Sequence, residues 1–335
     1  MRAYHLVPPL AGPAALTLAE RPAPQPGPGE VLLAMRAVGL NYRDLLVSRG
    51  QYGKLPDGRI PGSDGVGVIL ACGSGVSEFQ PGQRVAGCFM SGWIDGPLTS
   101  SVAATALGGA RDGVLAEQVV LPASGVVAVP EHLSDAEAAC LPCAGVTAWN
   151  ALFGTGATRS GETVLVLGTG GVAAFAIQFA RAAGCRVIAV SRSPEKLGAA
   201  RALGAHDAIS GDDWDDQIYQ LTAQQGVDHV IELGGPGTLP KSIRAVRMGG
   251  RISLIGTISG NEGPVPTANL LRKGVCLQGI FVGNRSHFLA MNRAIALHGL
   301  RPHVDRVFPF AEARAAYEHL ASATHVGKVV IAVSA

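Results

Sequence analysis

Short apolar runs separated by proline- and glycine-rich turns occupy residues 1–125. EVLLAMRAVGL (30–40) and GVGVILACG (65–73) are followed by the shorter runs QRVAGCF (83–89) and AEQVVLP (116–122). Segments such as PQPGPGE, PGSDG and QPGQ divide them. Apolar runs of this length, separated by segments rich in proline and glycine, indicate strands joined by tight turns. We therefore predict a β-rich first domain.

The pattern changes to a helical one at Ser134. DAEAACLPCAGVTAWNALF (135–153) has the apolar spacing and alanine content of a linking helix, with Ser134 or Asp135 as its N-cap. Apolar strands then alternate with amphipathic helices, which is typical of parallel βαβ units and a doubly wound sheet. The expected strands are 163–168, 186–191, 206–209, 227–232, 250–256 and 275–281, and the expected helices include 194–204, 212–224 and 237–247.

The last part of the chain differs from that alternation. It contains two helical patterns, 287–299 and 310–322, and a final apolar strand at 327–333. We expect this tail to return to the first domain. The predicted fold class is α/β, with a β-rich catalytic domain at 1–130, a Rossmann cofactor domain at 131–283 and a returning segment at 284–335.

A glycine turn follows the first strand of the alternating region. Gly168 to Ala173 fit G-x-G-x-x-A between a buried strand and a long apolar helix. Gly168 allows the tight turn, Gly170 lets the backbone approach a pyrophosphate, and Ala173 lets the helix pack closely on the sheet. The helix N-terminus adds free N–H groups and the positive end of its dipole. The turn predicts a dinucleotide site formed by Gly168, Thr169, Gly170, Gly171 and Val172.

The end of the next strand indicates which dinucleotide is bound. NAD-binding chains usually carry an acidic residue about 20 residues beyond the glycines. Here Ser191 and Arg192 follow the strand, with Lys196 a turn later. A hydroxyl beside a guanidinium and an ammonium suits a 2′-phosphate. We predict NADP, with NAD as the alternative if Arg192 and Lys196 are only solvated surface charges.

Composition narrows the class of protein further. The 335 residues are 47% hydrophobic and 16% charged, as in a compact enzyme, and the net charge is +2. Such a charge gives no reason to expect nucleic acid or an anionic membrane as a partner. No signal-peptide layout and no run of about 20 apolar residues is present, so we expect a cytoplasmic protein with a small-molecule substrate. The six cysteines have no framework spacing, which favours free thiols.

Seven ordered motifs together resemble one family. They are AVGLNYRDLLVSRGQYG (37–53), PGSDGVGVI (61–69), FQPGQRVAG (79–87), DGVLAEQVVLP (112–122), LPCAGVTAWNAL (141–152), GGRISLIG (249–256) and the terminal GKVVIAV. With the cofactor turn, they resemble the medium-chain dehydrogenases/reductases, in the zinc-free quinone oxidoreductase-like and alcohol dehydrogenase-like branch. The resemblance implies a GroES-like catalytic domain beside the Rossmann domain.

The resemblance also argues against a metal. The positions that carry zinc ligands in metal-dependent members hold Asn41, Ser63 and Cys143 here. Catalytic zinc needs three side-chain donors and an open position, and one thiol cannot supply them. The four-cysteine structural zinc lobe is also missing from this sequence. We predict no zinc, and we interpret Cys140 and Cys143 as buried apolar thiols, with a redox pair as the alternative.

The family's active-site segments supply the site residues. The resemblance implies catalytic roles for residues of the two former ligand loops, with Asp44 and Asp64 alternatively serving as structural acceptors of backbone N–H groups. Tyr42 is either a phenol donor or a packed core aromatic, and Tyr52 is expected to be exposed. The expected catalytic residues are Asn41, Tyr42, Asp44, Tyr52 and Ser63. The resemblance further implies that Thr147, Phe281, Val282 and Gly283 lie near the nicotinamide, and we expect Lys328 in the same crevice. Gly234, Gly256 and Thr257 are expected near the cofactor because they follow strand ends, where a parallel sheet binds its ligand.

Without a metal, reduction of a conjugated C=C bond is the least demanding chemistry. The charge moves to an enolate oxygen that a few hydrogen-bond donors hold. The sequence therefore predicts an NADPH-dependent reductase of quinones, enones or enals. The alternatives are a metal-free alcohol dehydrogenase with a tyrosine acid, or a non-catalytic dinucleotide sensor. We also expect a homodimer through strand 275–281, as an apolar sheet edge without lysine or proline.

Overall fold

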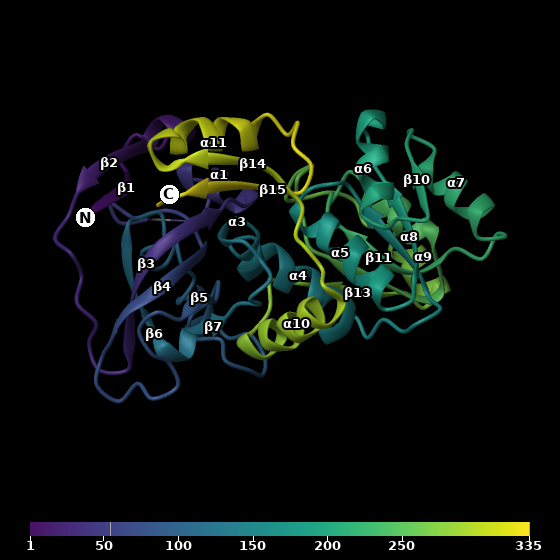
Figure 1. Ribbon diagram of the computed structural model, residues 1–335. Coiled ribbons are helices and arrows are strands. Elements are labelled where there is room, and N and C mark those ends of the chain that lie inside the picture. The colour runs from purple at the N-terminus through teal and green to yellow at the C-terminus, as the bar shows by residue number, and fades with distance from the viewer. Residues whose placement is uncertain (54, 335) are drawn as a thin grey trace. The chain divides into compact units, whose positions relative to one another are not determined.

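The computed structural model describes residues 1–53 and 55–334, which fold into two compact units (Figure 1). Unit 1 comprises Met1–Val146 and Gly283–Ala335, and unit 2 comprises Thr147–Val282. The boundary predicted at 130/131 is therefore too early. Residues 131–146 belong to unit 1 because its buried groups hold them. The Asp64 carboxylate accepts the Cys143 N–H at 2.9 Å, and Glu137 pairs with Arg301 at 2.8 Å.

Unit 1 is built on a seven-stranded sheet, as the short apolar runs predicted. Its strand order is β14-β15-β3-β4-β5-β7, and β6 also pairs with β3. Only β14 and β15 run parallel in this sheet. The strands are β3 (Glu30–Gly39), β4 (Asp64–Cys72), β5 (Arg84–Gly87), β6 (Gln118–Pro122), β7 (Val126–Ala128), β14 (Val304–Pro309) and β15 (Lys328–Ala332). A separate pair, β1 (Arg2–Leu6) and β2 (Leu16–Glu20), completes the unit's strands.

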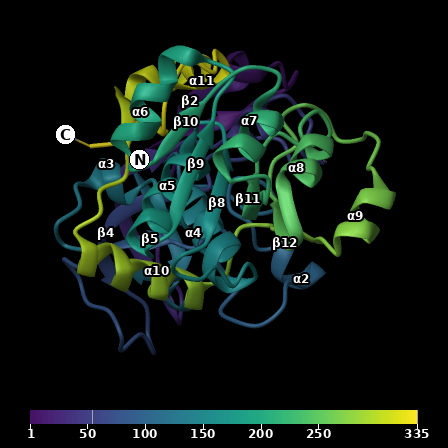
Figure 2. The same cartoon turned by 90° about the vertical axis from the view of Figure 1, so that its right-hand side faces the viewer.

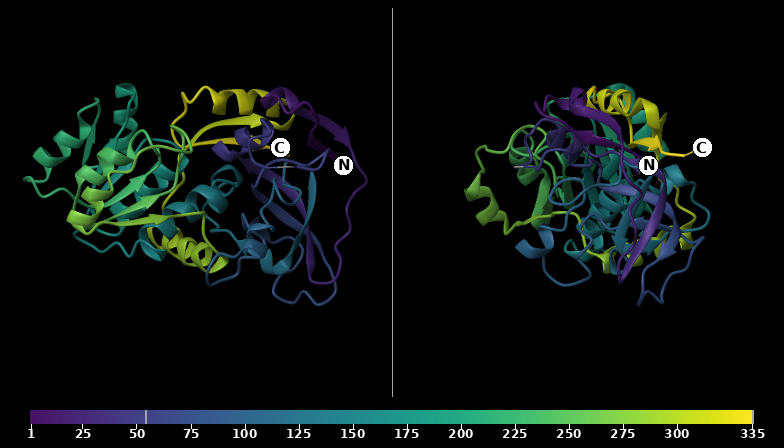
Figure 3. Two further views of the ribbon diagram at one scale, coloured as in Figure 1. Left: turned by 180° about the vertical axis from the view of Figure 1, so that it is seen from behind. Right: turned by 90° about the vertical axis from the view of Figure 1, so that its left-hand side faces the viewer.

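The C-terminal segment completes this sheet. β15 lies between β14 and β3, so the last strand of the chain pairs with one of the first (Figure 3). Helix α11 (Ala313–Ala321) covers it, and Tyr317 from this helix is fully buried among Leu33, Met35 and Val329 of the same core. β14 was not predicted, because the polar Asp305 and Arg306 interrupt its apolar pattern. The placement brings Lys328 to the start of a central strand.

Unit 2 is a parallel sheet of six strands, in agreement with the predicted doubly wound fold. The order is β10-β9-β8-β11-β12-β13 (Figure 2). All strands are parallel, and the direction in which successive strands are added to the sheet reverses between β8 and β11. Ligands of such sheets bind beyond the carboxyl ends of the strands at this reversal. The strands are β8 (Thr163–Leu167), β9 (Arg186–Val190), β10 (Asp207–Ile209), β11 (Val227–Glu232), β12 (Val246–Leu254) and β13 (Cys276–Gly279). The helices are α5 (Gly171–Ala182), α6 (Leu197–Ala202), α7 (Trp214–Leu221), α8 (Leu239–Ala245) and α9 (Thr267–Lys273).

Two predicted helices differ from the structure. The helix expected at 237–247 ends at Ala245, because β12 begins directly at Val246 and uses the last two residues. The linking helix has its N-cap at Ser134, whose hydroxyl accepts the Glu137 N–H at 3.2 Å. It is then broken into α3 (Asp135–Ala138), a wider turn at Leu141–Gly145, α4 (Val146–Trp149) and a second wide turn at Asn150–Gly154. Pro142 lacks the N–H that a regular helix requires.

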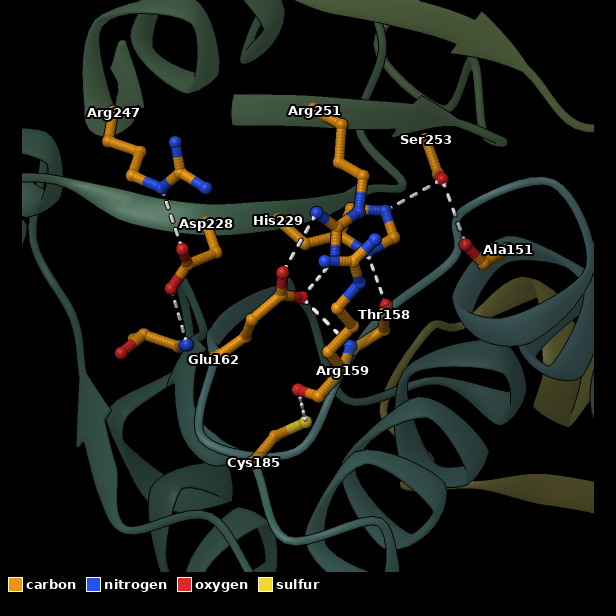
Figure 4. A network of polar contacts seen from close by, with 11 residues as sticks. Ala151, Thr158, Arg159, Glu162, Cys185, Asp228, His229, Arg247, Arg251 and Ser253 are labelled. Carbon is orange, nitrogen blue, oxygen red and sulfur yellow. Dashed lines mark hydrogen bonds and ion pairs between the residues drawn. The ribbon is translucent and has the colours of Figure 1, made fainter. Parts of the chain in front are cut away.

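A polar network joins residues of β11 and β12 to the segment that leads into β8 (Figure 4). The imidazole of His229 is fully buried between the hydroxyls of Thr158, at 2.8 Å, and Ser253, at 2.9 Å. Beside it Arg251 forms an ion pair with Glu162. These contacts hold β11 and β12 to the segment that precedes β8.

The helices of both units are short. The longest, α10 (Arg285–His298), has 14 residues. Within residues 1–53 and 55–334, no helix is long and apolar enough to cross a bilayer.

Candidate active site

The cofactor turn has the geometry that its glycines predicted. Gly168 follows β8 with φ of +87°, a conformation that side chains disfavour. A Cβ placed on Gly170 would meet nothing within 4 Å, so the backbone at this position is open to a ligand. No side chain caps the N-terminus of α5, and Ala173 is fully buried against the sheet. The free N–H groups of this first turn, including those of Gly171 and Val172, suit a pyrophosphate.

The predicted 2′-phosphate residues lie at the end of the neighbouring strand β9. Ser191 is buried, and its hydroxyl accepts the Ser193 N–H at 3.2 Å. Arg192 is exposed and Lys196 is half-buried on the short turn that follows. Because β8 and β9 are parallel neighbours, this turn and the glycine turn share one edge of the sheet.

A buried carboxylate at the end of β11 holds the loop that follows and the first turns of α8, and sequence patterns did not reveal it. Glu232 is fully buried. Its Oε1 accepts from the Gly234 N–H at 2.8 Å, the Gly235 N–H at 3.1 Å and the Thr238 hydroxyl at 2.6 Å. Its Oε2 accepts from the Ser242 hydroxyl. An acidic residue at the end of an apolar strand, followed by two glycines, is the signal that could have identified it.

The loops after β11 and β12 also contact each other closely. The Ser259 N–H donates to Gly234 O at 2.9 Å. A Cβ on Gly256 would come within 2.1 Å of Leu233 O, so only glycine allows this approach. The structure thus brings together Gly234, Gly256 and Thr257, as expected for a ligand-binding crest.

The segment after β13 is strained. Val282 has φ of +58°, which is an outlier for a β-branched residue. The buried Asn150 amide donates to Val282 O at 2.7 Å and so holds the residue in place. Thr147 is buried near the start of the same broken helix, Phe281 is 44% exposed, and Gly283 falls in unit 1.

A closed ring of polar groups lies in unit 1. Asn41, the N-cap of α1 (Tyr42–Ser48), donates through Nδ2 to the Ser63 hydroxyl at 3.3 Å. Ser63 donates to Asp64 Oδ1 at 2.7 Å. The Lys328 ammonium donates to Asn41 Oδ1 and Leu40 O, both at 2.6 Å, and lies 3.9 Å from Asp64 Oδ2. Asn41, Ser63, Asp64 and Lys328 are all buried.

This ring changes two sequence-based assignments. Lys328 was expected beside the cofactor. Only 3% of its side chain is exposed, and its ammonium instead donates to Leu40 O and Asn41 Oδ1 of its own unit. Ser63 gives its single proton to Asp64, which leaves Asn41 as the amide donor of the pair. Asp64 acts as an acceptor for a backbone and a side-chain donor.

Asp44 is a second buried carboxyl of this region. It is fully buried and accepts the Asn41 N–H at 2.8 Å as part of the helix cap. Burial raises its pKa to about 6, against the lowering effect of the neighbouring Arg43 guanidinium. Asp44 therefore fixes the start of α1 rather than facing solvent.

The two candidate tyrosines occupy different environments. Tyr42 is 42% exposed, so it is not a packed core aromatic. Tyr52 is half-buried and stacks on the Arg43 guanidinium at 4.7 Å, while Phe89 covers the guanidinium at 4.9 Å. Arg43 also donates to Leu107 O at 2.7 Å. Tyr52 is therefore less exposed than its glycine neighbours suggested.

The donor set does not fit a catalytic zinc. Asn41 and Ser63 are bonded within the ring, with an ammonium on the Asn41 oxygen. Cys143 is the one member of the set with a side chain that zinc ordinarily takes, and burial raises the pKa of its thiol well above the usual range. Burial likewise raises the pKa of Cys140 to about 12, unlike a reactive redox thiol. Among the residues that the structure describes, no three His, Cys, Asp or Glu side chains gather as metal ligands.

Comparison with known proteins places the chain in a family. An alcohol dehydrogenase GroES-like domain family matches residues 27–131, and a zinc-binding dehydrogenase family matches residues 171–296. A zinc-type alcohol dehydrogenase-like protein of Schizosaccharomyces pombe is 44% identical over 317 residues, 91% of each chain. The chain belongs to the medium-chain dehydrogenase/reductase superfamily, among the alcohol dehydrogenase-like NAD(P)-dependent oxidoreductases.

Solved structures agree with this assignment. An NAD-dependent alcohol dehydrogenase is 34% identical, with 100% of both chains covered and a TM-score of 0.92. A mycobacterial protein complexed with NADPH is 28% identical, with 99% of this chain and 100% of that chain covered and a TM-score of 0.83. The predicted combination of a GroES-like and a Rossmann domain is confirmed.

Proposed function

We propose that the protein is an NADPH-dependent, zinc-independent reductase of conjugated carbonyl compounds such as quinones, enones and enals. The observation that carries the proposal is the ring in unit 1. Where metal-dependent relatives need three ligands, this chain has an amide, a hydroxyl committed to a carboxylate, and a single thiol. Such groups donate hydrogen bonds but provide no Lewis acid.

Reduction of a conjugated C=C bond fits these donors. NADPH, held by the glycine turn and the N-terminus of α5, would supply a hydride to the β-carbon of the substrate. The negative charge then moves to the carbonyl oxygen as an enolate. The Asn41 amide is the donor that stabilises this oxygen, and the exposed Tyr42 phenol is a second candidate. A solvent proton completes the reaction at the α-carbon.

A substrate panel tests the proposal. The purified chain, with NADPH and with any bound metal removed by chelation, is offered a quinone, an enone, an enal and the matching saturated ketone. We expect loss of the reduced nicotinamide absorbance with the conjugated compounds and none with the ketone. Turnover of the ketone alone, or activity that requires added zinc, would refute the proposal.

An alcohol dehydrogenase that works without a metal is the second candidate, since relatives are named alcohol dehydrogenases or alcohol dehydrogenase-like proteins. It requires a proton donor, and the exposed Tyr42 is the better placed of the two phenols, because Tyr52 is stacked on Arg43. Reversible oxidation of simple alcohols, lost more than about tenfold in Tyr42→Phe, would favour it. Tight NADPH binding without turnover of any substrate would favour a dinucleotide sensor instead.

The preference for NADPH is predicted to depend on Arg192. Arg192→Ala should raise the KM for NADPH by roughly 10- to 150-fold, as expected for the loss of one charge-assisted contact. The KM for NADH should stay nearly unchanged, because NADH lacks the 2′-phosphate. Steady-state kinetics with both cofactors measure this, and Arg201→Ala, a basic residue on the nearby helix α6, is the control. Equal effects on both cofactors would contradict the assignment.

The proposal includes a homodimer through β13. This strand is at the edge of the unit 2 sheet and pairs there only with β12. Leu271 and Phe281, which flank the strand, are 83% and 44% exposed. Pairing with a second copy would bond the free backbone groups and cover these side chains through one two-fold contact.

Leu277→Pro is expected to weaken this dimer selectively. The Ile280 N–H donates to β12 at 2.9 Å. By the alternation of a strand, the Leu277 N–H therefore faces the free edge, and proline would remove it without breaking the β12 pairing. Light scattering should show a dimer for the unmodified chain and for Leu277→Val, and a higher monomer fraction for Leu277→Pro. An unmodified chain that is monomeric at micromolar concentration would refute the dimer.

A further inference from the structure

Lys328 carries a buried positive charge that has no role in the reaction proposed above. Its ammonium donates to Leu40 O and Asn41 Oδ1, both at 2.6 Å, and is 3.9 Å from Asp64 Oδ2. The side chains of Lys328 and Asp64 are 3% and 0% exposed. A buried cation with such partners either compensates a buried carboxylate, orients a neighbour, or does both.

The contact determines which way the Asn41 amide points. The oxygen and nitrogen of an amide are interchangeable by shape, so their assignment depends on the hydrogen-bond partners. An ammonium only donates, and therefore it requires the Asn41 oxygen on its side. The Asn41 nitrogen must then face the opposite side, where it meets the Ser63 hydroxyl at 3.3 Å.

The rest of the ring prevents the opposite orientation. The single Ser63 proton goes to Asp64 Oδ1 at 2.7 Å, so the Ser63 oxygen is available as an acceptor for Asn41. The other oxygen of Asp64 accepts the Cys143 N–H at 2.9 Å, which holds the carboxylate in the orientation that receives the Ser63 proton. Each donor in the ring thus has a defined acceptor. The amide nitrogen carries two N–H groups, one of which is used by Ser63.

We propose that Lys328 is a positioning residue that locks Asn41 as a hydrogen-bond donor to the carbonyl oxygen of the substrate. This rests on the proposed reductase function. The ammonium also neutralises Asp64, so the ring presents a donor without an uncompensated negative charge beside the developing enolate. Lys328 acts through Asn41 and is not a ligand of the cofactor.

Three variants test this role: Lys328→Met, Asp64→Asn and the double variant. Lys328→Met removes the orienting donor but leaves Asp64 buried and unpaired, so it is expected to be unstable. The double variant removes both charges and should regain stability. We expect its kcat for an enone to remain about 10- to 100-fold below that of Asp64→Asn, while the KM for NADPH changes less than twofold. Lys241→Met is the control: Lys241 is a half-buried lysine of unit 2, and its ammonium donates to Asp212 O.

A mutant cycle with Asn41→Ala separates positioning from a general structural role. If Lys328 acts through Asn41, adding Asn41→Ala to the double variant should lower kcat no further, although Asn41→Ala lowers it in the Asp64→Asn background. Fully multiplicative losses would overturn the proposal, as would a rise in the KM for NADPH at unchanged kcat. Wild-type protein that reduces none of the conjugated compounds would overturn the proposed function, and this inference with it.

Discussion

Replacing Glu232 by alanine is expected to lower the free energy of unfolding by about 3–5 kcal/mol, because donors are left buried without an acceptor. The carboxylate accepts from two backbone N–H groups and two hydroxyls at the end of β11. Its loss should also loosen the loop that carries Gly234, and NADPH binding should weaken. Urea denaturation and fluorescence titration with NADPH measure the two effects.

Glu232→Gln is the matched control for this prediction. Its amide oxygen retains the three donors that now reach Oε1, and its nitrogen faces only Ser242, whose hydroxyl is also an acceptor. The loss of stability should stay below about 1.5 kcal/mol, which is the ordinary contribution of one hydrogen bond. Equal losses in the alanine and glutamine variants would show that the negative charge, and not the hydrogen bonds, anchors the loop.

The cofactor unit was largely predictable because its signals are local. The strand, turn and helix around Gly168 are contiguous, and the reversal of strand order follows from regular alternation. The glycines are needed for local reasons: Gly168 has a positive φ, and Gly256 lies too close to the Leu233 carbonyl for a side chain. Residues at strand ends could therefore be assigned to the crest from sequence spacing alone.

The catalytic unit was less predictable because its contacts join distant parts of the chain. Lys328 reaches Asn41 across 287 residues, so no local pattern indicates their hydrogen bond. The expected role of Lys328 came from the position of its motif, which specifies a strand but not the partner of the ammonium. The stacking of Tyr52 on Arg43 likewise depends on how α1 packs, and a glycine-flanked tyrosine alone suggests exposure.

Burial of charge explains why the site could not be assigned from residue types. Asp44 and Asp64 look equivalent in the sequence, as loop carboxylates of two similar motifs. In the structure Asp44 caps a helix and Asp64 completes the ring with Lys328. Their roles are set by the donors that reach each oxygen, and those donors come from separate segments of the chain.

Acid should destabilise the protein through His229. Burial, with a smaller contribution from the neighbouring Arg251 charge, lowers the pKa of this imidazole to about 3. Because the Ser253 hydroxyl donates to Ala151 O at 3.2 Å, the neutral ring donates from Nε2 to Ser253 and accepts the Thr158 hydroxyl at Nδ1. Unfolding restores the ordinary pKa of about 6.5, so the unfolded chain binds the extra proton first.

The sign and size of the effect follow from that difference. The stabilisation is complete above pH 6.5 and declines by about 1.4 kcal/mol per unit as the pH falls toward 3. Asp44, whose pKa is raised to about 6, acts in the opposite direction as the pH falls from 6 to 4, so the wild-type profile alone is ambiguous. His229→Asn removes the imidazole and keeps Asp44. Between pH 6.5 and 4, urea denaturation should show the wild type losing about 3 kcal/mol more than the variant. Parallel pH profiles for the two proteins would contradict the assignment.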